Sequence, residues 1–229
     1  MIYDRLRDSL PRWLRDYVQH FEAAIDASVA EFARTLPPDS RVLDAGAGET
    51  QHRDHFKTHR YCALDLGIGD AQWDYSRLDV VGDLSALPFR DASFDACLNV
   101  VTLEHVRDPA RVVSELARVL EPGGCILLIA PHEWEEHQAP HDYFRYTRYG
   151  LEYLLARAGF TGISVVPVGG FFRLLSRRLF NALQFFPGPT IFLAALVFVP
   201  AALVAPLADP LDRRRNFTLG YICTACKPS

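Results

Sequence analysis

Residues 42–48 read Val-Leu-Asp-Ala-Gly-Ala-Gly, a mostly apolar run that ends in two closely spaced glycines. The run Val42–Ala45 predicts a buried strand. Gly46 and Gly48 let the chain turn sharply and let the backbone approach a ligand without a side chain in between. A helix that begins after such a turn directs free amide groups at a carboxylate or phosphate. A ligand-free turn from strand to helix has the same sequence, so this motif alone assigns no site.

Outward from this motif, short apolar runs alternate with helical patterns. Further strand-like runs cover residues 61–65, 79–81, 94–99, 125–130, 163–168 and 217–225. Apolar residues recur every three or four positions over 110–120, a pattern closed by Pro122-Gly123-Gly124, and a second helix is expected over 151–158. This alternation predicts an α/β fold, a doubly wound and mostly parallel sheet with helices on both faces.

In such a sheet the ligand lies at the carboxyl ends of the strands. Asp65 ends the second strand, 21 residues after Asp44, where an acidic side chain can accept hydrogen bonds from both hydroxyls of a ribose. A dinucleotide fingerprint requires a third glycine where this chain has Gln51. A nucleoside without a pyrophosphate therefore fits the motif better.

The motifs at the strand ends together resemble those of class I S-adenosylmethionine-dependent methyltransferases, in the family that includes quinone and small-molecule methyltransferases. The resemblance covers roughly residues 38–170 and rests on an ordered set: Asp44-Ala45-Gly46-Ala47-Gly48, Asp65, Gly82-Asp83-Leu84 with Leu87-Pro88-Phe89, Phe94-Asp95, Leu103-Glu104-His105-Val106, Asp108-Pro109 and Leu120-Glu121-Pro122-Gly123-Gly124. It implies a seven-stranded Rossmann-like methyltransferase sheet with an antiparallel last strand. Thr50 departs from the pattern, because many relatives have a third glycine there.

The resemblance implies that S-adenosylmethionine is the cofactor and that it is bound by Asp44, Ala45, Gly46, Gly48, Asp65, Leu66, Asp83, Leu84 and Asn99. The two glycines would lie beside the methionine portion, with Asp44 at the same turn, and Asp65 would hold the ribose hydroxyls. Asp83 would accept from the adenine amino group, the Leu84 amide would donate to the adenine ring, and Asn99 would lie near the sulfonium.

The acceptor site is expected in the stretch His141-Asp142-Tyr143-Phe144-Arg145-Tyr146-Thr147. Methyl transfer depends mainly on alignment, but a neutral hydroxyl acceptor needs a base, and histidine has a suitable pKa. The predicted catalytic residues are His141, the best candidate for the base, and Asp142. The predicted substrate residues are His105, Tyr143, Arg145 and Tyr146. The alternative is that Asp142 and Arg145 form a structural ion pair while the aromatic residues pack against the sheet.

No metal site and no disulfide are expected. His132 and His137 are five positions apart, so they would not share a helix face. The five cysteines, Cys62, Cys97, Cys125, Cys223 and Cys226, are too few and too scattered for a disulfide scaffold, which predicts reduced thiols.

An uncharged segment over residues 180–208 separates the last two strands, and 18 residues of helix over 191–208 would be about 27 Å long, near the thickness of a bilayer core. Because the last strand returns to the same sheet, a single span is excluded. The prediction is a re-entrant or interfacial hairpin with bends at Pro187-Gly188-Pro189 and at Pro200, flanked by Arg173, Arg177, Arg178, Arg213, Arg214 and Arg215. The alternative is a pair of helices that cap the site or form a homodimer interface.

The 229 residues carry a net charge of −4, which gives no indication of nucleic-acid binding. The predicted organisation is an N-terminal helical lid over 1–37, a cofactor-binding core over 38–170, a hydrophobic insertion over 171–216 and a terminal strand over 217–229. Met1–Arg7 lacks the apolar stretch of a secretory signal. These features predict a cytoplasmic methyltransferase, peripheral or monotopic on the membrane, that O-methylates a hydrophobic small molecule or lipid. The alternatives are a soluble small-molecule methyltransferase and a catalytically silent membrane anchor with the same fold.

Overall fold

The computed structural model describes residues 11–69 and 72–229, so the expectation drawn from Met1–Arg7 lies outside the described residues. Its centre is one seven-stranded sheet with the strand order β3-β2-β1-β4-β5-β7-β6. The strands are β1 Arg41–Ala45, β2 Arg60–Asp65, β3 Val80–Val81, β4 Phe94–Val100, β5 Leu120–Pro131, β6 Thr161–Val168 and β7 Gly220–Cys226. The predicted doubly wound α/β fold is confirmed.

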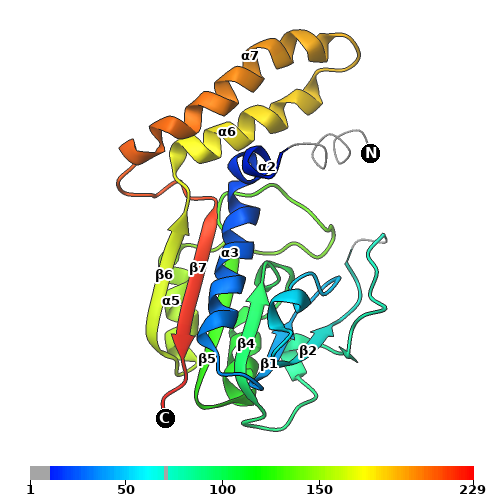
Figure 1. The fold of residues 1–229 in the computed structure, drawn as a ribbon, viewed down its shortest axis with the longest axis vertical. Helices are drawn as coiled ribbons and strands as arrows, with labels where there is room; N and C mark the ends of the chain where they lie inside the picture. Colours follow the sequence, from blue (N-terminus) through cyan, green and yellow to red (C-terminus); the bar gives the residue numbers. More distant parts are fainter. Residues whose placement is uncertain (1–10, 70–71) are drawn as a thin grey trace. The chain divides into compact units, whose positions relative to one another are not determined.

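The sheet is mixed, as expected. Strands β1 to β5 pair in parallel, and the arrowheads of β6 and β7 point in opposite directions (Figure 1). Hydrogen bonds at both ends of this pair agree: the Leu219 amide donates to the Val168 carbonyl, and the Thr161 hydroxyl donates to the Cys226 carbonyl. The last strand therefore returns into the sheet antiparallel.

Two helices on one face of the sheet follow directly from sequence signals. Asp108 accepts from the Arg111 amide and begins α4 (Pro109–Val119), and Thr147 accepts from the Gly150 amide and begins α5 (Arg148–Arg157). The helix predicted over 110–120 is confirmed as α4, which ends at Val119, and Pro122-Gly123-Gly124 lies within β5, which starts immediately at Leu120. The register between β4 and β5 is irregular there, which accommodates residues 121–124 as a bulge.

The described part of the N-terminal segment, predicted as a helical lid over 1–37, forms two helices. Helix α2 (Arg12–Val18) ends at Gln19, whose ψ of 55° is not helical, and α3 (His20–Thr35) follows. The side chains of Ile25, Val29 and Phe32 on α3 are buried, and α3 and α5 lie on opposite faces of the sheet (Figure 1).

The chain divides into two compact units: Ile25–Val166 with Tyr221–Ser229, and the described part of Met1–Ala24 with Pro167–Gly220. The second unit contains a helical hairpin, α6 (Phe171–Ala182) and α7 (Thr190–Val204), seen side by side in Figure 1. The Ser176 hydroxyl donates to the Ala202 carbonyl at 2.6 Å and joins the two helices. The chain reverses at residues 183–189 as predicted, whereas Pro200 lies inside α7 and does not end that helix.

Helix α2 belongs to the same unit as the hairpin. The Tyr17 hydroxyl donates to the Leu203 carbonyl at 2.7 Å, and the Arg173 guanidinium lies 4.7 Å from the centre of the Tyr17 ring. Burial and the neighbouring arginines lower the pKa of His20, the first residue of α3. These contacts group the first helix with the hairpin.

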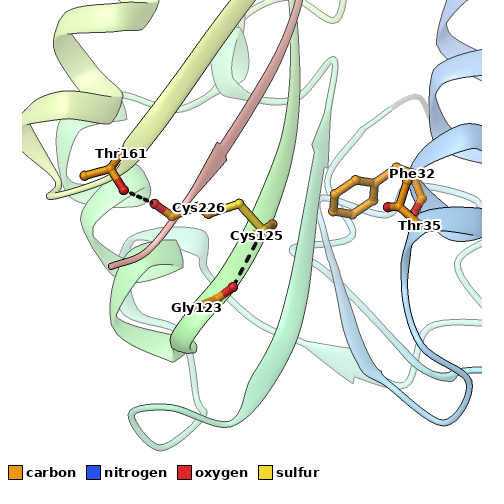
Figure 2. Close-up of a disulfide and its surroundings, with 6 residues drawn as sticks. All are labelled: Phe32, Thr35, Gly123, Cys125, Thr161 and Cys226. Atoms are coloured by element: carbon orange, nitrogen blue, oxygen red, sulfur yellow. Dashed lines mark hydrogen bonds between the residues drawn. A yellow bond between two sulfur atoms is a disulfide. The ribbon is translucent and has the colours of Figure 1, made fainter. Parts of the chain in front are cut away.

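A disulfide joins Cys125 on β5 to Cys226 on the neighbouring strand β7, with their Cα atoms 4.0 Å apart (Figure 2). The expectation of reduced thiols is therefore wrong for this pair, while Cys62, Cys97 and Cys223 are free. The 101 residues between the two cysteines concealed the pairing, since only the strand order places them together. In a reducing compartment this bond would be open.

Candidate active site

A cavity of about 370 Å³ lies where β1, β2 and β4 end. Its lining comes from the loops that follow these strands and from the segment after β5. The predicted site residues in the lining are Gly46, Gly48, Asp65, Leu66, Asp83, Leu84, His105 and His141. The structure therefore brings together residues from five separate sequence motifs at the edge where the fold class places a ligand.

The turn after β1 requires glycine. Gly46 has a φ of +87°, and a Cβ there would lie 2.3 Å from the Thr102 side chain. The amides of Gly46 and Ala47 donate to the Leu64 carbonyl, which fixes the turn against β2. Thr50, the departure from the expected glycine, adopts a φ of +59° and is buried. Thr50 therefore has the left-handed backbone conformation that a glycine would adopt there, although threonine favours this conformation less than glycine does.

Asp65 connects the glycine turn to the loop after β2. Its Oδ2 accepts from the Gly48 amide at 3.0 Å and its Oδ1 accepts from the Gly67 amide at 2.8 Å. A carboxylate has about four lone-pair sites, so acceptor capacity is left for two ribose hydroxyls. The arrangement fits a bound nucleoside.

The cavity lining also includes the two residues predicted to contact adenine: Asp83, whose Oδ1 accepts from the Ser85 amide at 2.8 Å, and the buried Leu84. The predicted site residues do not include Trp73 and Tyr75, two aromatic residues of the lining that follow β2. The Tyr75 hydroxyl accepts from the Gly69 amide at 2.7 Å, and a Cβ on Gly48 would touch the Trp73 ring. Both lie in an irregular loop after β2, where no periodicity points to a site.

Asp44, Ala45 and Asn99 lie inside the strand ends, fully buried, and are not among the described residues that line the cavity. The Tyr61 hydroxyl donates to Asp44 Oδ2, and burial raises the pKa of Asp44 to about 7. The Asn99 amide nitrogen donates to the Ala45 carbonyl at 2.8 Å. Their position suits them to hold the turn in place beneath the cavity.

The predicted acceptor residues separate into two groups. His105 and His141 line the cavity, and His141 Nδ1 lies 3.1 Å from the Tyr143 hydroxyl. Asp142 and Arg145 instead form a two-pronged ion pair with distances of 2.6 and 2.8 Å, which holds the pKa of Asp142 well below its usual range. For these two residues the structure matches the ion-pair alternative.

Tyr143, Arg145 and Tyr146 are not among the described residues of the lining. Tyr146 is buried in the core and its hydroxyl donates to the Leu103 carbonyl at 2.7 Å. The Tyr143 amide donates to the Glu104 carbonyl at 2.9 Å. The stretch thus attaches the segment after β5 to the short helix Leu103–His105.

Glu104 and His137 lie beside the cavity but outside the predicted catalytic and substrate sets. Glu104 is fully buried, and burial raises the pKa of its carboxyl to about 8. Its Oε1 lies 3.7 Å from His105 Nε2 and 4.0 Å from His137 Nε2. The sequence signal was present in the Leu103-Glu104-His105-Val106 motif, but only the fold brings His137 beside it.

Comparisons with known proteins agree with this geometry. Residues 43–128 match the family model described as "Methyltransferase domain". A probable S-adenosylmethionine-dependent methyltransferase of Mycolicibacterium smegmatis is 38% identical over 97 residues, which are 40% of this chain and 38% of the relative. A demethylmenaquinone methyltransferase of Renibacterium salmoninarum is 34% identical over 97 residues, which are 40% of this chain and 41% of the relative.

The fold extends further than this sequence similarity. The structure of phosphoethanolamine N-methyltransferase 2 of Haemonchus contortus in complex with S-adenosyl-L-methionine is similar with a TM-score of 0.58 and 16% identity, over 90% of this chain and 53% of that chain. The chain spans about two fifths of the length of the curated relatives described above. The strand order, the glycine turn with Asp65 and the methyltransferase-domain match over residues 43–128 together support a class I S-adenosylmethionine-dependent methyltransferase.

Proposed function

We propose that this protein transfers the methyl group of S-adenosylmethionine to an oxygen of a hydrophobic, membrane-associated small molecule or lipid. The observation that carries the proposal is the exposed apolar surface of the α6–α7 hairpin, next in sequence to a methyltransferase core. A hydrophobic acceptor dissolves in the bilayer, so an enzyme that binds the bilayer surface meets it at high local concentration.

The outer surface of the hairpin is apolar and exposed. Phe192, Leu193 and Leu196 on α7 are 71–77% exposed, and Phe185 before the turn is 75% exposed. The stretch Thr190–Leu211 is long and apolar enough to cross a membrane, and 17% of its most apolar window is buried. Large exposed apolar surfaces are typical of membrane or protein interfaces.

Charges at the base of the hairpin support binding to an anionic surface. Arg213 and Arg214 are exposed, whereas Arg173 contacts Tyr17, Arg177 pairs with Glu22 and Arg215 pairs with Asp209. Each exposed arginine contributes about 1 kcal/mol of attraction to an anionic leaflet. Both ends of the hairpin belong to the same compact unit, which suits an interfacial hairpin on the cytoplasmic face better than a single span.

Vesicle flotation tests the membrane part of the proposal. The full-length protein, freed of detergent, should float with vesicles that contain phosphatidylserine and should float less with neutral vesicles. Protein that stays at the bottom of the gradient with both vesicle types, as a stable dimer, would contradict the proposal. That outcome favours the second candidate function, a soluble small-molecule methyltransferase whose hairpins bury each other.

His141 is the proposed general base for the acceptor hydroxyl. It lines the cavity and its ring lies within hydrogen-bond distance of Tyr143. Replacement His141→Ala should lower kcat by about 10²- to 10⁴-fold, the usual contribution of a positioned base, with cofactor affinity unchanged. Rates are measured as release of S-adenosylhomocysteine, with His59→Ala outside the cavity as the control. A kcat equal to that of the control would remove His141 from the mechanism.

A further inference from the structure

The side chains of Glu104, His105 and His137 converge beside the cavity, and their ligand-type atoms all lie within 4.8 Å of one another. His105 and His137 line the cavity, and Glu104 lies behind them, fully buried. Within the described part of the chain, neither carboxylate oxygen of Glu104 makes a hydrogen bond, and neither does His105 Nε2. A buried carboxyl group without such partners is costly, and a bound cation would supply the missing partner.

The partners of Nδ1 in each histidine ring indicate which ring nitrogen carries the proton. His105 Nδ1 lies 2.6 Å from the His141 carbonyl oxygen, and a carbonyl only accepts, so Nδ1 carries the proton. His137 Nδ1 lies 3.1 Å from the Glu135 carbonyl and 3.4 Å from Asp142 Oδ2, both acceptors; the Arg145 guanidinium is farther away, at 3.5 Å. In the neutral rings the two Nε2 atoms therefore carry lone pairs, which face the Glu104 carboxylate.

With Glu104 ionised, three acceptors point at one another and need a cation between them, either a proton on the Glu104 carboxyl or a metal ion that replaces that proton. A backbone carbonyl or carboxylate on the far nitrogen of a histidine is the usual outer shell of a metal ligand, because it fixes the tautomer that leaves the other nitrogen free to bind. Two histidines and one glutamate, with a further position for water or substrate, is a ligand set of catalytic zinc sites.

We propose that Glu104, His105 and His137 bind a divalent transition-metal ion such as Zn²⁺, with its open position directed at the cavity. Ligands bound at about 2.0–2.1 Å in a tetrahedron lie about 3.3 Å apart. The observed distances from Glu104 Oε1, 3.7 and 4.0 Å, are slightly wider and require movements below about 1 Å. His137 lies in a segment without helix or strand, where such a movement is easiest.

The catalytic role of this metal site rests on the proposed function, methyl transfer to an oxygen. The oxygen of an acceptor hydroxyl would occupy the open position, lose its proton to His141 or water, and form the new bond to the methyl carbon as the bond from that carbon to the cofactor sulfur breaks. S-adenosylhomocysteine leaves with the electron pair of that bond. Metal binding itself needs neither the acceptor nor the cofactor.

Titration with Co²⁺ alone, followed by visible absorption, tests the site without reference to activity. The full-length protein, first dialysed against a chelator, should bind one equivalent and develop ligand-field bands. Glu104→Gln and His137→Ala should each weaken binding by more than about 100-fold, the upper range for loss of a mere outer-shell partner. His59→Ala removes an imidazole outside the cluster and should bind Co²⁺ like the parent.

Two results of the Co²⁺ titration would contradict the proposed metal site. Absence of stoichiometric binding by the parent, or binding that persists in both ligand variants, contradicts it. S-adenosylmethionine affinity is measured for every variant as the check that the fold is intact. A protein that binds the cofactor but no metal leaves the methyltransferase proposal in place, so the two failures are distinguishable.

Discussion

Replacement Asp65→Ala is expected to weaken S-adenosylmethionine binding by at least about 100-fold. Its carboxylate accepts from the Gly48 and Gly67 amides and has capacity left for the ribose hydroxyls. Hydrogen bonds to a charged group contribute about 1.5–3 kcal/mol each, and the loss of two corresponds to a factor of 100 or more. Isothermal titration calorimetry measures the effect directly.

Two variants sharpen this experiment. Asp65→Asn keeps the shape and one acceptor oxygen, so its affinity should be intermediate. Asp54→Ala removes a carboxylate that is 77% exposed and outside the cavity, and it should bind the cofactor like the parent. If Asp65→Ala binds S-adenosylmethionine as tightly as Asp54→Ala does, the assignment of Asp65 to the ribose is wrong.

The double replacement Phe192→Glu with Leu196→Glu is expected to abolish vesicle binding. Each charge placed in the hydrocarbon region costs about 2.5–3.5 kcal/mol on insertion scales, so two should reduce partitioning by more than about 1,000-fold. Both side chains are at least 75% exposed, so the replacement removes little packing within the protein. Flotation with anionic vesicles is the measurement, and cofactor affinity should be unchanged.

A matched control is available on α5. Tyr149 and Tyr153 are 77% and 62% exposed, and their replacement by glutamate adds the same charge away from the hairpin. This control should float like the parent. Equal flotation of both double variants would show that the hairpin surface does not enter the membrane, and a monomer formed only by the hairpin variant would point to a dimer interface.

Much of the fold was predictable from local pattern. The apolar runs before Gly46 and Asp65 mark strands whose carboxyl ends meet in the sheet, and Asp108 and Thr147 cap the helices that the periodicity predicts. The length of the uncharged segment and its internal turn predicted the hairpin. These features depend on residues near one another in sequence, where spacing alone determines the structure.

The parts that sequence did not predict depend on contacts between distant segments. Cys125 and Cys226 meet because β7 inserts between β5 and β6. His137 joins Glu104 because the loop after β5 folds back over the short helix Leu103–His105. The role of Asp142 was ambiguous for the same reason, since its neighbour Arg145 had two plausible environments and the structure places it in an ion pair.

Methyl transfer to a hydrophobic acceptor can be tested by a labelling experiment. The purified full-length protein is incubated with methyl-labelled S-adenosylmethionine and a whole extract of its host, and the products are partitioned between organic and aqueous phases. We expect label in the organic phase with the parent protein and no label there with Asp65→Ala. Label confined to the aqueous phase would contradict the hydrophobic acceptor, and no transferred label in either phase would contradict the methyltransferase activity itself.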